Sequence, residues 1–578
     1  MRTKLMAVCI SAAALMLMAV ASAWTSPATA QSIPTDAQAT CTVSAATFAG
    51  WFQSGTVTLN GVVNPANSVT FPNVPNCSFY QWSKQMFLWL TSPAPATYGG
   101  GGGRIFDSPT FYDVSPLNAS GQRTLIPHTP GLIRAFPLRA AQVGPHNLPV
   151  ITDTAGRLFE IESTQVEPAT KPLIRSKAGK MIAIESVRLG ANGKPVFLDK
   201  AGKTIATQAL TLKAAAQVRT VRRIIINRIP IFLDSSGNVI DTEEGQADLS
   251  VLVAQNGSLV YYATIVNDVY AYFLTGAKDG KITPSNSFPT TAANLAQITA
   301  FASAHGVTFP DPNALAIEVK SAWIEAAGLP NLSSYITMQA TIPTYNTSSS
   351  TSWTVTGQKT VELALVGIHV VGSTAGHPEM IWSTFEHFGN APNAAYSYNS
   401  TAGTKTVPQN TAGTWLFSTS GSGGPFNIVH AQNLTGADIT AVSGQTISPS
   451  DTMRIKPWGG AANASPNPLD STAAASNTEI ISINNSISSM MPSGDVRNNY
   501  FMTGATWTIG GASPTSNFGN PGNTGGNTVG TSQLNNTTME TYQQGTTAFV
   551  ANGSNCFACH VTNSTLVSHV FADIQPLF

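Results

Sequence analysis

The sequence predicts an α+β fold that is predominantly β: a large β-rich body with several helices, an inserted β-hairpin module and a separate C-terminal segment. Three observations lead to this prediction. Residues 335–371 have the spacing of strands, and the nearly continuous apolar run Val361–Val371 is typical of a strand buried on both faces. Residues 134–245 repeat an apolar strand, a glycine-containing turn and a second apolar strand. Residues 393–530 are rich in Asn, Ser, Thr and Gly, which indicates short strands and long loops.

The chain is long and carries few charges. Of its 578 residues only 10% are Asp, Glu, Lys or Arg, whereas about 25% is typical of soluble domains. The 29 basic and 29 acidic residues cancel, so the composition indicates neither a nucleic-acid partner nor an acidic membrane surface. The length allows a large core and about two to four domains.

The most specific motif is the C-x-x-C-H sequence of residues 556–560. Two thiols three positions apart, followed at once by a histidine, form the pattern for covalent attachment of haem c. Each cysteine adds to one vinyl group, and the imidazole binds the iron. A thioredoxin-like redox pair and half of a zinc site are the alternatives. We predict one covalent haem c in the segment 531–578, held by Cys556, Cys559 and His560.

The second axial ligand of such an iron is less well defined. Only 18 residues follow His560, and His569 is the local candidate. On one straight helix the two imidazoles would lie roughly 13 Å apart, too far to share one iron, but residues 563–565 can turn the chain. A methionine ligand would raise the reduction potential, a second histidine would lower it, and an open position would permit chemistry with oxygen or peroxide. The other candidates are Met490, Met491, Met502, Met539, His369, His377, His387 and His430.

The first thirty residues have the pattern of an export signal. Arg2 and Lys4 precede the apolar run Leu5–Val20, and two small-residue cleavage sites follow. We expect cleavage before Gln31 and a periplasmic or secreted protein without a transmembrane segment. A membrane anchor is the alternative, but the run is short, and no later stretch reaches the roughly 18 apolar residues needed to span a bilayer.

The N-terminal part of the main body, residues 31–133, contains two more cysteines. In an oxidising compartment Cys41 and Cys77 are expected to form a disulfide, two free thiols being the alternative. The segment Ser78–Leu90 has apolar residues at spacings of three and four, which predicts an amphipathic helix directly after Cys77. Its aromatic side chains would pack in the core or cover one haem face. Residues 55–61 indicate a strand and a turn.

The predicted module at residues 134–245 is basic. Between Arg134 and Arg228 lie 16 of the 29 Lys and Arg residues of the chain. Such a surface would dock an acidic redox partner or would simply be solvated. The four predicted hairpins are Val150–Leu158, Ser176–Ile182, Val196–Ile205 and Ile231–Ile240.

The main body, residues 246–530, is expected to contain further helices. Helical spacing is found at Leu259–Leu274, at Asn313–Ala327 before Gly328, and at Asn477–Met491. Residues 377–387 combine two histidines and two carboxylates, and a proline with a glutamate at their start predicts a helix. These four side chains would bind a metal or relay protons, or they would form a hydrogen-bonded structural corner.

Three stretches together resemble a group of exported bacterial c-haem-domain proteins, the cytochrome c family, of largely uncharacterised function. They are Gly376–His387, Asn536–Tyr542 and the C-terminal C-x-x-C-H sequence. The resemblance covers scattered blocks between residues 313 and 578. It implies haem binding at the C-terminal motif, implies no reaction, and does not include the module at 134–240.

Three functions agree with these observations. The first is an exported monohaem c-type cytochrome that transfers single electrons to or from a periplasmic redox partner protein. The second is a haem-dependent oxidoreductase of oxygenase or peroxidase type, with an open distal site and acid–base assistance from His377 and His387. The third is a secreted β-rich binding protein in which the C-x-x-C-H sequence is structural.

Overall fold

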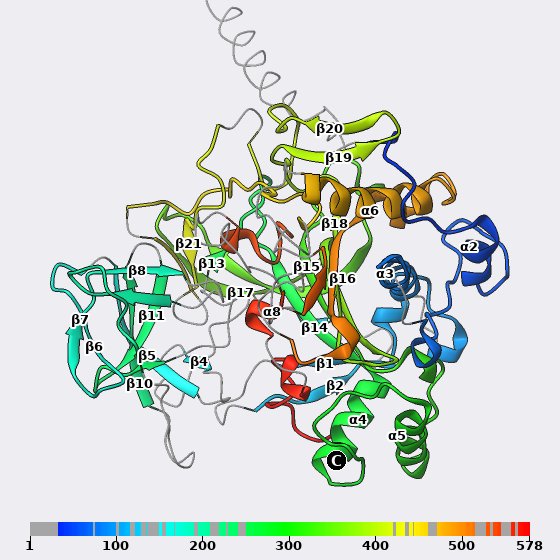
Figure 1. Ribbon diagram of the computed structural model, residues 1–578, viewed down its shortest axis with the longest axis horizontal. Helices are drawn as coiled ribbons and strands as arrows, with labels where there is room; N and C mark the ends of the chain where they lie inside the picture. Colours follow the sequence, from blue (N-terminus) through cyan, green and yellow to red (C-terminus); the bar gives the residue numbers. More distant parts are fainter. Residues whose placement is uncertain are drawn as a thin grey trace, which may run out of the picture.

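A computed structural model describes most of the chain (Figure 1). The predicted export signal and its cleavage site before Gln31 lie outside the described residues, as does the turn of the first predicted hairpin. The residues described are 33–72, 76–99, 103–115, 122–128, 134–135, 150–152, 158–166, 168–189, 195–207, 219–226, 229–240, 250–419, 423–433, 438–442, 444–460, 471–514, 527–531, 536–544, 556–560 and 564–578.

The described residues form a β-rich fold around one large sheet, as the sequence predicts. In its centre five strands pair antiparallel in the order β14, β15, β17, β18 and β23. These strands are β14 (Tyr261–Asn267), β15 (Ile317–Glu325), β17 (Ser352–Thr374), β18 (His377–His387) and β23 (Tyr500–Thr508). The sheet continues through β1 (Phe111–Val114), β2 (Leu125–Pro127), β3 (Arg134–Ala135), β13 (Ser250–Val251), β16 (Thr337–Asn346), β21 (Ala431–Gln432), β22 (Ile439–Ala441) and β24 (Thr528–Gly530).

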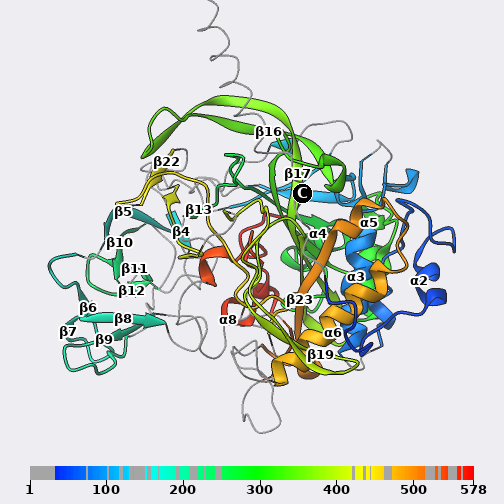
Figure 2. The ribbon, with the colours of Figure 1, turned by 90° about the horizontal axis from the view of Figure 1, so that it is seen from above.

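Strand β17 runs through the middle of this sheet and confirms the prediction for residues 335–371. Residues 363–371 are buried, because β15 pairs with one edge, β18 pairs with the other, and both faces are covered. The preceding half, residues 352–362, pairs with β16 and is mostly exposed, and the two strands form the long arm seen in Figure 2.

The two faces of the central sheet differ in chemistry. On one face, which we call the apolar face, Val319 and Val370 join a hydrophobic core made with α3 (Cys77–Leu90) and α6 (Ser471–Ser488). Figure 2 shows these two helices side by side. Because side chains alternate along a strand, the residues next to these valines in the sequence point to the opposite face. We call that opposite face the polar face; its members are Glu318, Lys320, His369 and Trp382.

Helix α3 confirms the predicted amphipathic helix. Phe79, Trp82 and Met86 are buried in the core of the apolar face. They therefore pack against the sheet from the side opposite the polar face, which agrees with a core role rather than with a cover for a haem. Helix α6 confirms the helix predicted at 477–491, although it begins six residues earlier, at Ser471.

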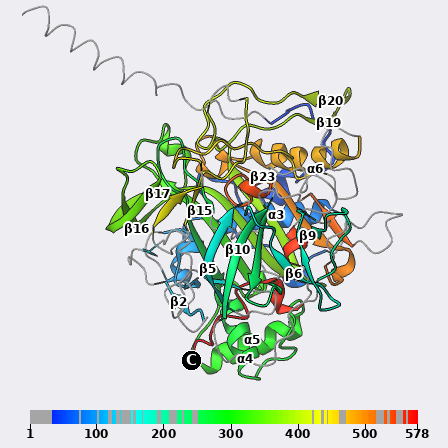
Figure 3. The same cartoon turned by 90° about the vertical axis from the view of Figure 1, so that its left-hand side faces the viewer.

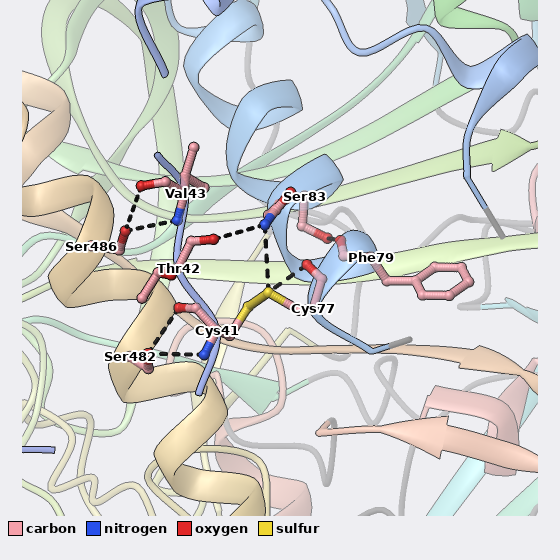
Figure 4. The surroundings of a disulfide bond; sticks show 9 residues. Cys41, Thr42, Val43, Cys77, Phe79, Ser83, Ser482 and Ser486 are labelled. Atoms are coloured by element: carbon pink, nitrogen blue, oxygen red, sulfur yellow. Dashed lines mark hydrogen bonds between the residues drawn. A yellow bond between two sulfur atoms is a disulfide. The ribbon is translucent and has the colours of Figure 1, made fainter. Parts of the chain in front are cut away.

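The predicted disulfide between Cys41 and Cys77 is present, with Cα atoms 5.3 Å apart. It joins an extended N-terminal segment to the start of α3 (Figure 4). The same segment is bound to α6, because the backbone of Cys41 both donates to and accepts from the Ser482 hydroxyl, at 3.0 and 2.8 Å. The disulfide therefore holds the N-terminal segment between the two helices that cover the apolar face.

Removing this disulfide is expected to destabilise the fold. The loop closed by the bond spans 36 residues, and in the chain-entropy model the double substitution Cys41→Ala/Cys77→Ala should lower the free energy of unfolding by about 3–4 kcal/mol. Urea unfolding of the two proteins under oxidising conditions measures the difference. A change below about 1 kcal/mol would show that the bond constrains the unfolded chain far less than the model requires.

A second, smaller sheet is built from residues 150–240. Its strands follow the order β12-β11-β10-β5-β4; it lies to one side of the large sheet in Figure 1 and faces the viewer in Figure 3. Its strands and the neighbouring hairpins enclose a hydrophobic cluster of their own, which includes Ile174, Phe197 and Leu233. The strands are β4 (Val150–Thr152), β5 (Leu158–Val166), β10 (Arg219–Ile226), β11 (Ile229–Asp234) and β12 (Val239–Ile240); the hairpins are β6 (Leu173–Arg175) with β7 (Met181–Ala183), and β8 (Ser186–Leu189) with β9 (Pro195–Leu198).

Three of the four predicted hairpins have the predicted pairing: β4 with β5, β6 with β7, and β11 with β12. In the last, the Asp234 carboxylate accepts from the amides of Ser236 and Asn238 at 2.9 and 2.8 Å, and Gly237 has φ +75°. The third prediction is only partly correct. The turn at Asp199 forms, but β9 pairs mainly with the preceding strand β8. Residues Arg134–Ala135, where the predicted module begins, pair with β16 of the large sheet.

Three predicted helices are wrong in whole or in part. Residues 259–274 are strand β14 followed by α4 (Asp268–Lys278), because Asn267 caps a helix that begins only there. Residues 313–327 contain strand β15, whose pairing with β14 and β17 overrides the helical spacing. Residues 377–387 are strand β18, paired with β17 and β23. At residues 55–61 the structure has turns and bends but no strand.

Candidate functional site

The polar face gathers titratable side chains from neighbouring strands. Lys320 of β15 lies opposite His369 of β17 in the strand register. Glu318 of β15 lies opposite Val371, which in turn pairs with Trp382 of β18. Because side chains two residues apart on a strand point to the same side, these groups share one face. Such a row of polar residues within a buried sheet is unusual and marks this face as the candidate site.

The C-terminal segment lies on this polar face. Helix α8 (Cys556–Cys559) is a single turn, drawn in red near the middle of Figure 1. Phe557 is buried and contacts the ring of Trp382 edge to face, with centroids 6.3 Å apart. Val567 and Phe571 belong to the same hydrophobic cluster, together with residues of α4. The predicted haem motif is therefore held against the sheet by its own apolar neighbours.

Further hydrogen bonds fix the end of the chain. The backbone of Arg123 accepts from Gln575 at 2.8 Å and donates to Asp573 at 2.9 Å. The ammonium group of Lys278, at the end of α4, donates to the carbonyl of Ala572 at 2.9 Å. These contacts anchor the residues that follow His560, and the packing of Phe557 anchors those that precede it.

His560 has the surroundings expected of a metal-binding histidine. Its Nδ1 lies 2.7 Å from the carbonyl oxygen of Val567. A carbonyl oxygen only accepts, so this contact assigns the proton to Nδ1 and leaves the lone pair on Nε2, the arrangement usual for histidine ligands. The ring also packs against Trp382, with centroids 4.0 Å apart.

The electrostatic surroundings of His560 favour its neutral form. Although part of the residue is exposed, desolvation by the groups packed around it lowers its pKa well below the usual range. The nearby His569, Lys320 and His369 lower this pKa further, because each disfavours a second positive charge. Metal ligation requires a neutral imidazole with a free nitrogen. The lowered pKa favours the neutral form, and the contact with Val567 leaves Nε2 as the free nitrogen.

His569 lies beside His560, as a turn in the chain between them requires. The turn is made by a short 3-10 helix, Thr565–Val567. The two imidazole rings are stacked, with centroids 3.9 Å apart and planes inclined by 15°. Two axial ligands of one iron instead point their nitrogen atoms at each other from opposite sides. The structure therefore brings the two predicted residues together in a stacked arrangement, and ligation by His569 stays a prediction.

A hydrogen-bonded chain of buried groups adjoins His569. The Ser568 hydroxyl lies 2.8 Å from the hydroxyl of Tyr270 on α4 and donates to the carboxylate of Glu318 at 2.5 Å. Burial raises the pKa of Glu318 and raises that of Tyr270 well above its usual range. This chain of hydroxyl and carboxyl groups connects the C-terminal segment to strand β15.

The segment 536–544 covers the neighbouring part of the polar face. Its Glu540 carboxylate lies 3.0 Å from Nε2 of His369, without the geometry of a hydrogen bond. Thr538 crosses β17 at Gly367, where a Cβ atom would lie 2.1 Å from the threonine hydroxyl oxygen. Only glycine therefore permits this approach, which places an acid–base pair near His560.

The two histidines and two carboxylates of residues 377–387 do not come together as one group. An 11-residue strand separates His377 and His387 by roughly 33 Å along its length. His377 is paired with Glu379 at 2.8 Å, and both are buried. Burial lowers the pKa of His387 to about 3, and its ring stacks on Tyr335 with centroids 3.9 Å apart.

The fourth member of that cluster, Glu386, forms a buried ion pair with Arg454. The guanidinium binds both carboxylate oxygens, at 3.1 and 2.9 Å, and neither side chain is exposed. The backbone amide of Thr537 also donates to Glu386, at 2.8 Å. Glu386 is thus fully engaged in joining β18 to the segment 536–544.

The remaining ligand candidates belong to other surroundings. Met491 and Met502 are buried in the core of the apolar face, and Met490 packs against it. Met539 lies in a separate hydrophobic cluster with Tyr335 and Phe417. Among the upstream histidines that the structure describes, His369 is an electrostatic neighbour of His560.

The residues present therefore fit a covalently attached haem. Cys556 and Cys559 are the first and last residues of one helical turn. His560 follows directly and keeps Nε2 for a metal. The sequence did not indicate Trp382, Lys320 or Glu318 as part of this site, because the patterns of residues 313–327 and 377–387 predict helices and the structure has strands there. The alternation of Glu318 and Lys320 with Ile317 and Val319 was the signal that could have shown it.

Comparison with known proteins adds no assignment: no family model matches the chain, and neither a curated protein nor a solved structure is detectably similar to it. Within the described residues, no three or more His, Cys, Asp and Glu side chains are grouped as a metal site. In the same part of the chain, no helix combines the length and the apolar character needed to cross a membrane.

Proposed function

We propose that this chain is an exported monohaem c-type cytochrome. Cys556 and Cys559 would hold one haem covalently, and His560 would be its axial ligand. A haem held in this way takes up and releases single electrons. The observation that carries the proposal is the 2.7 Å contact between His560 Nδ1 and the Val567 carbonyl oxygen. It orients the imidazole and directs its lone pair onto Nε2, which a merely structural histidine does not require.

Three features of the chain support this role. Trp382 packs against the ring of His560, and Phe557 packs against Trp382. A less polar environment tunes the reduction potential of a haem. The anchoring of residues 564–578 on α4 and on Arg123 fixes the imidazole independently of the long loops. The N-terminal export pattern agrees with haem attachment outside the cytoplasm, and we propose a periplasmic or secreted location.

We further propose that residues 134–245 form an inserted basic module that docks an acidic redox partner protein. The hydrophobic cluster of this part is its own, and the sheet lies beside the body that carries His560. The basic residues between 134 and 228 would give such a surface its positive charge. Opposite charge on a partner speeds its encounter more than it tightens the complex.

The proposal is tested by producing the full chain in an exporting bacterium that also makes a cytochrome c maturation system. The purified protein should be coloured, with a sharp α-band after reduction, and the haem should remain bound through acid–acetone extraction because thioether bonds hold it. Mass spectrometry should show one haem added to the peptide with residues 556–560. A colourless exported protein would overturn the proposal.

A second candidate function, a haem-dependent oxidoreductase, is favoured by one observation. The His369–Glu540 contact places an acid–base pair on the same face as His560, where it would hold or move a proton during catalysis. Binding of carbon monoxide separates the two candidates. A low-spin haem that ignores carbon monoxide supports electron transfer, whereas a high-spin haem that binds it supports an open site and catalysis.

A further inference from the structure

The first half of the motif at residues 376–387 is a buried hydrogen-bonded network. His377 and Glu379 lie in strand β18, three to five residues ahead of Trp382, and both are at most 1% exposed. Buried polar groups are costly unless hydrogen bonds hold them. The hydrogen bonds that hold these two residues lead to Trp382, and the ring of Trp382 packs against His560.

The carboxyl group of Glu379 joins two neighbouring strands. The ladder between β18 and β23 ends at the pair of Trp382 and Thr506. Two residues further along β23, the amide and the hydroxyl of Thr508 donate to Oε1 of Glu379 at 3.1 and 2.8 Å. The Nδ1 atom of His377 lies 2.8 Å from the same oxygen. The carboxyl oxygen therefore continues the connection between the two strands beyond the end of the ladder.

This connection holds an unusual stretch of backbone. Met380 follows Glu379 and has a φ of +68°, a conformation that residues with a side chain rarely adopt. Such a conformation persists only where the surroundings hold it. Here Thr508 holds Glu379, and the side chain of Met380 is buried in the same hydrophobic cluster as Phe557. The backbone carbonyl of Glu379 then accepts from the indole N–H of Trp382 at 2.9 Å. The direction of the indole thus depends on the backbone of residues 379 and 380.

The indole in turn restricts the ring of His560. The two ring centroids are 4.0 Å apart, and the planes are inclined by 39°. His569 stacks on the same imidazole with centroids 3.9 Å apart. The contact of Nδ1 with the Val567 carbonyl oxygen fixes one edge of the ring. Trp382 itself is only 7% exposed and is tied to Glu379, so it offers a rigid support to the imidazole.

We propose that Glu379 is a positioning residue for the axial ligand: by holding Trp382, it fixes the plane of the His560 imidazole. Groups around a metal ligand commonly set its orientation in this way. The functional meaning of this role rests on the proposed haem, whereas the orientation of the ring can be measured with or without it.

In the haem-bearing protein, electron paramagnetic resonance of the oxidised form reports the orientation of the axial imidazole. Glu379→Leu removes both carboxyl oxygens, so a spectrum of one species should become a mixture, because Trp382 is no longer held. Glu379→Gln keeps an oxygen that accepts from Thr508 and should restore the single species. In a Trp382→Phe background, which already lacks the indole N–H, Glu379→Leu should add no further change. An unchanged spectrum in Glu379→Leu would overturn the proposal.

The haem-free full chain, exported without a maturation system, gives a second readout. In the NMR spectrum of the protein labelled on its histidine rings, the signal that His560→Ala removes belongs to His560. The indole ring current should shift this signal upfield, Glu379→Leu should remove most of the shift, and Glu379→Gln should retain it. A protein that stays colourless beside a working maturation system contradicts the proposed function, and this measurement still decides on the positioning role. The same His560 shift in Glu379→Leu as in the unmodified protein would overturn that role.

Ser383→Ala is the matched control. Ser383 follows Trp382 on β18, is 2% exposed and donates to the Val370 carbonyl at 2.7 Å, so its loss removes a different buried hydrogen bond of the same strand. Both readouts should stay unchanged in this variant. A change as large as that in Glu379→Leu would indicate general loosening of β18 and would contradict the proposal. If Glu379→Leu fails to fold, Thr508→Val keeps the backbone amide and should change the same signals to a smaller extent; no change there would likewise count against the proposal.

Discussion

Replacing Cys559 or His560 with alanine is expected to remove the normal pigment, while the β-rich body is still exported. Each substitution takes away a bond that haem c attachment needs, a thioether in one case and the axial nitrogen in the other. Neither should unfold the body, because Phe557, Val567 and Phe571 still pack on the polar face. The visible spectrum of the purified variants, together with their yield in the exported fraction, measures both effects.

Two controls make this result specific. His430→Ala should keep the pigment, since the His430 ring is hydrogen-bonded to Ser448 and is not part of the C-terminal site. The Cys41→Ala/Cys77→Ala protein should also keep it, since those thiols form the disulfide. Normal colour in both the Cys559 and the His560 variants would exclude covalent haem attachment at this motif.

The role of His569 can be decided in the same series. If His569 is an axial ligand, His569→Ala should convert a low-spin haem to a high-spin one. If it only stacks on His560, the spin state should stay the same and the reduction potential should shift. The stacked rings favour the second result. Electron paramagnetic resonance of the oxidised protein distinguishes the two.

The largest loss of stability is expected from breaking the buried ion pair between Glu386 and Arg454. The change Arg454→Met leaves a carboxylate in a site with no exposure, and the removal of one partner of such a pair typically costs about 3–5 kcal/mol. The backbone amide and hydroxyl of Thr537 and the side-chain amide of Asn390 still donate to the Glu386 carboxylate, but they do not balance its charge. Urea unfolding should therefore show a much lower midpoint than for the unmodified protein.

The exposed pair of Lys405 and Asp36 provides the matched comparison. Its side chains are 50% and 40% exposed, so Lys405→Met should leave the unfolding midpoint nearly unchanged, because water screens the attraction between the two charges. The double variant Arg454→Met/Glu386→Met should recover part of the loss, because no unpaired charge then remains buried. If Arg454→Met and Lys405→Met lower the midpoint equally, the pair does not have the role that its burial indicates.

The sequence by itself determined the features that depend on a few neighbouring residues. The turns at Asp199 and Asp234 follow from a carboxylate that accepts from amides two and four residues ahead. Helix α3 follows from apolar spacing after Cys77. The prediction of haem attachment at the C-x-x-C-H motif also depends only on five consecutive residues, and it stays a prediction. In each case local chemistry decides, and distant parts of the chain need not be known.

Only the tertiary structure decided which groups share the site. Residues 313–327 and 377–387 have helical spacing, yet they lie between partner strands, and the ladder hydrogen bonds and two-sided burial of the sheet outweigh weak helical preference. That pairing puts Lys320 beside His369 and brings Trp382 to His560, although about 180 residues separate the last two. Contacts between such distant residues follow from strand register and packing, which no local pattern encodes.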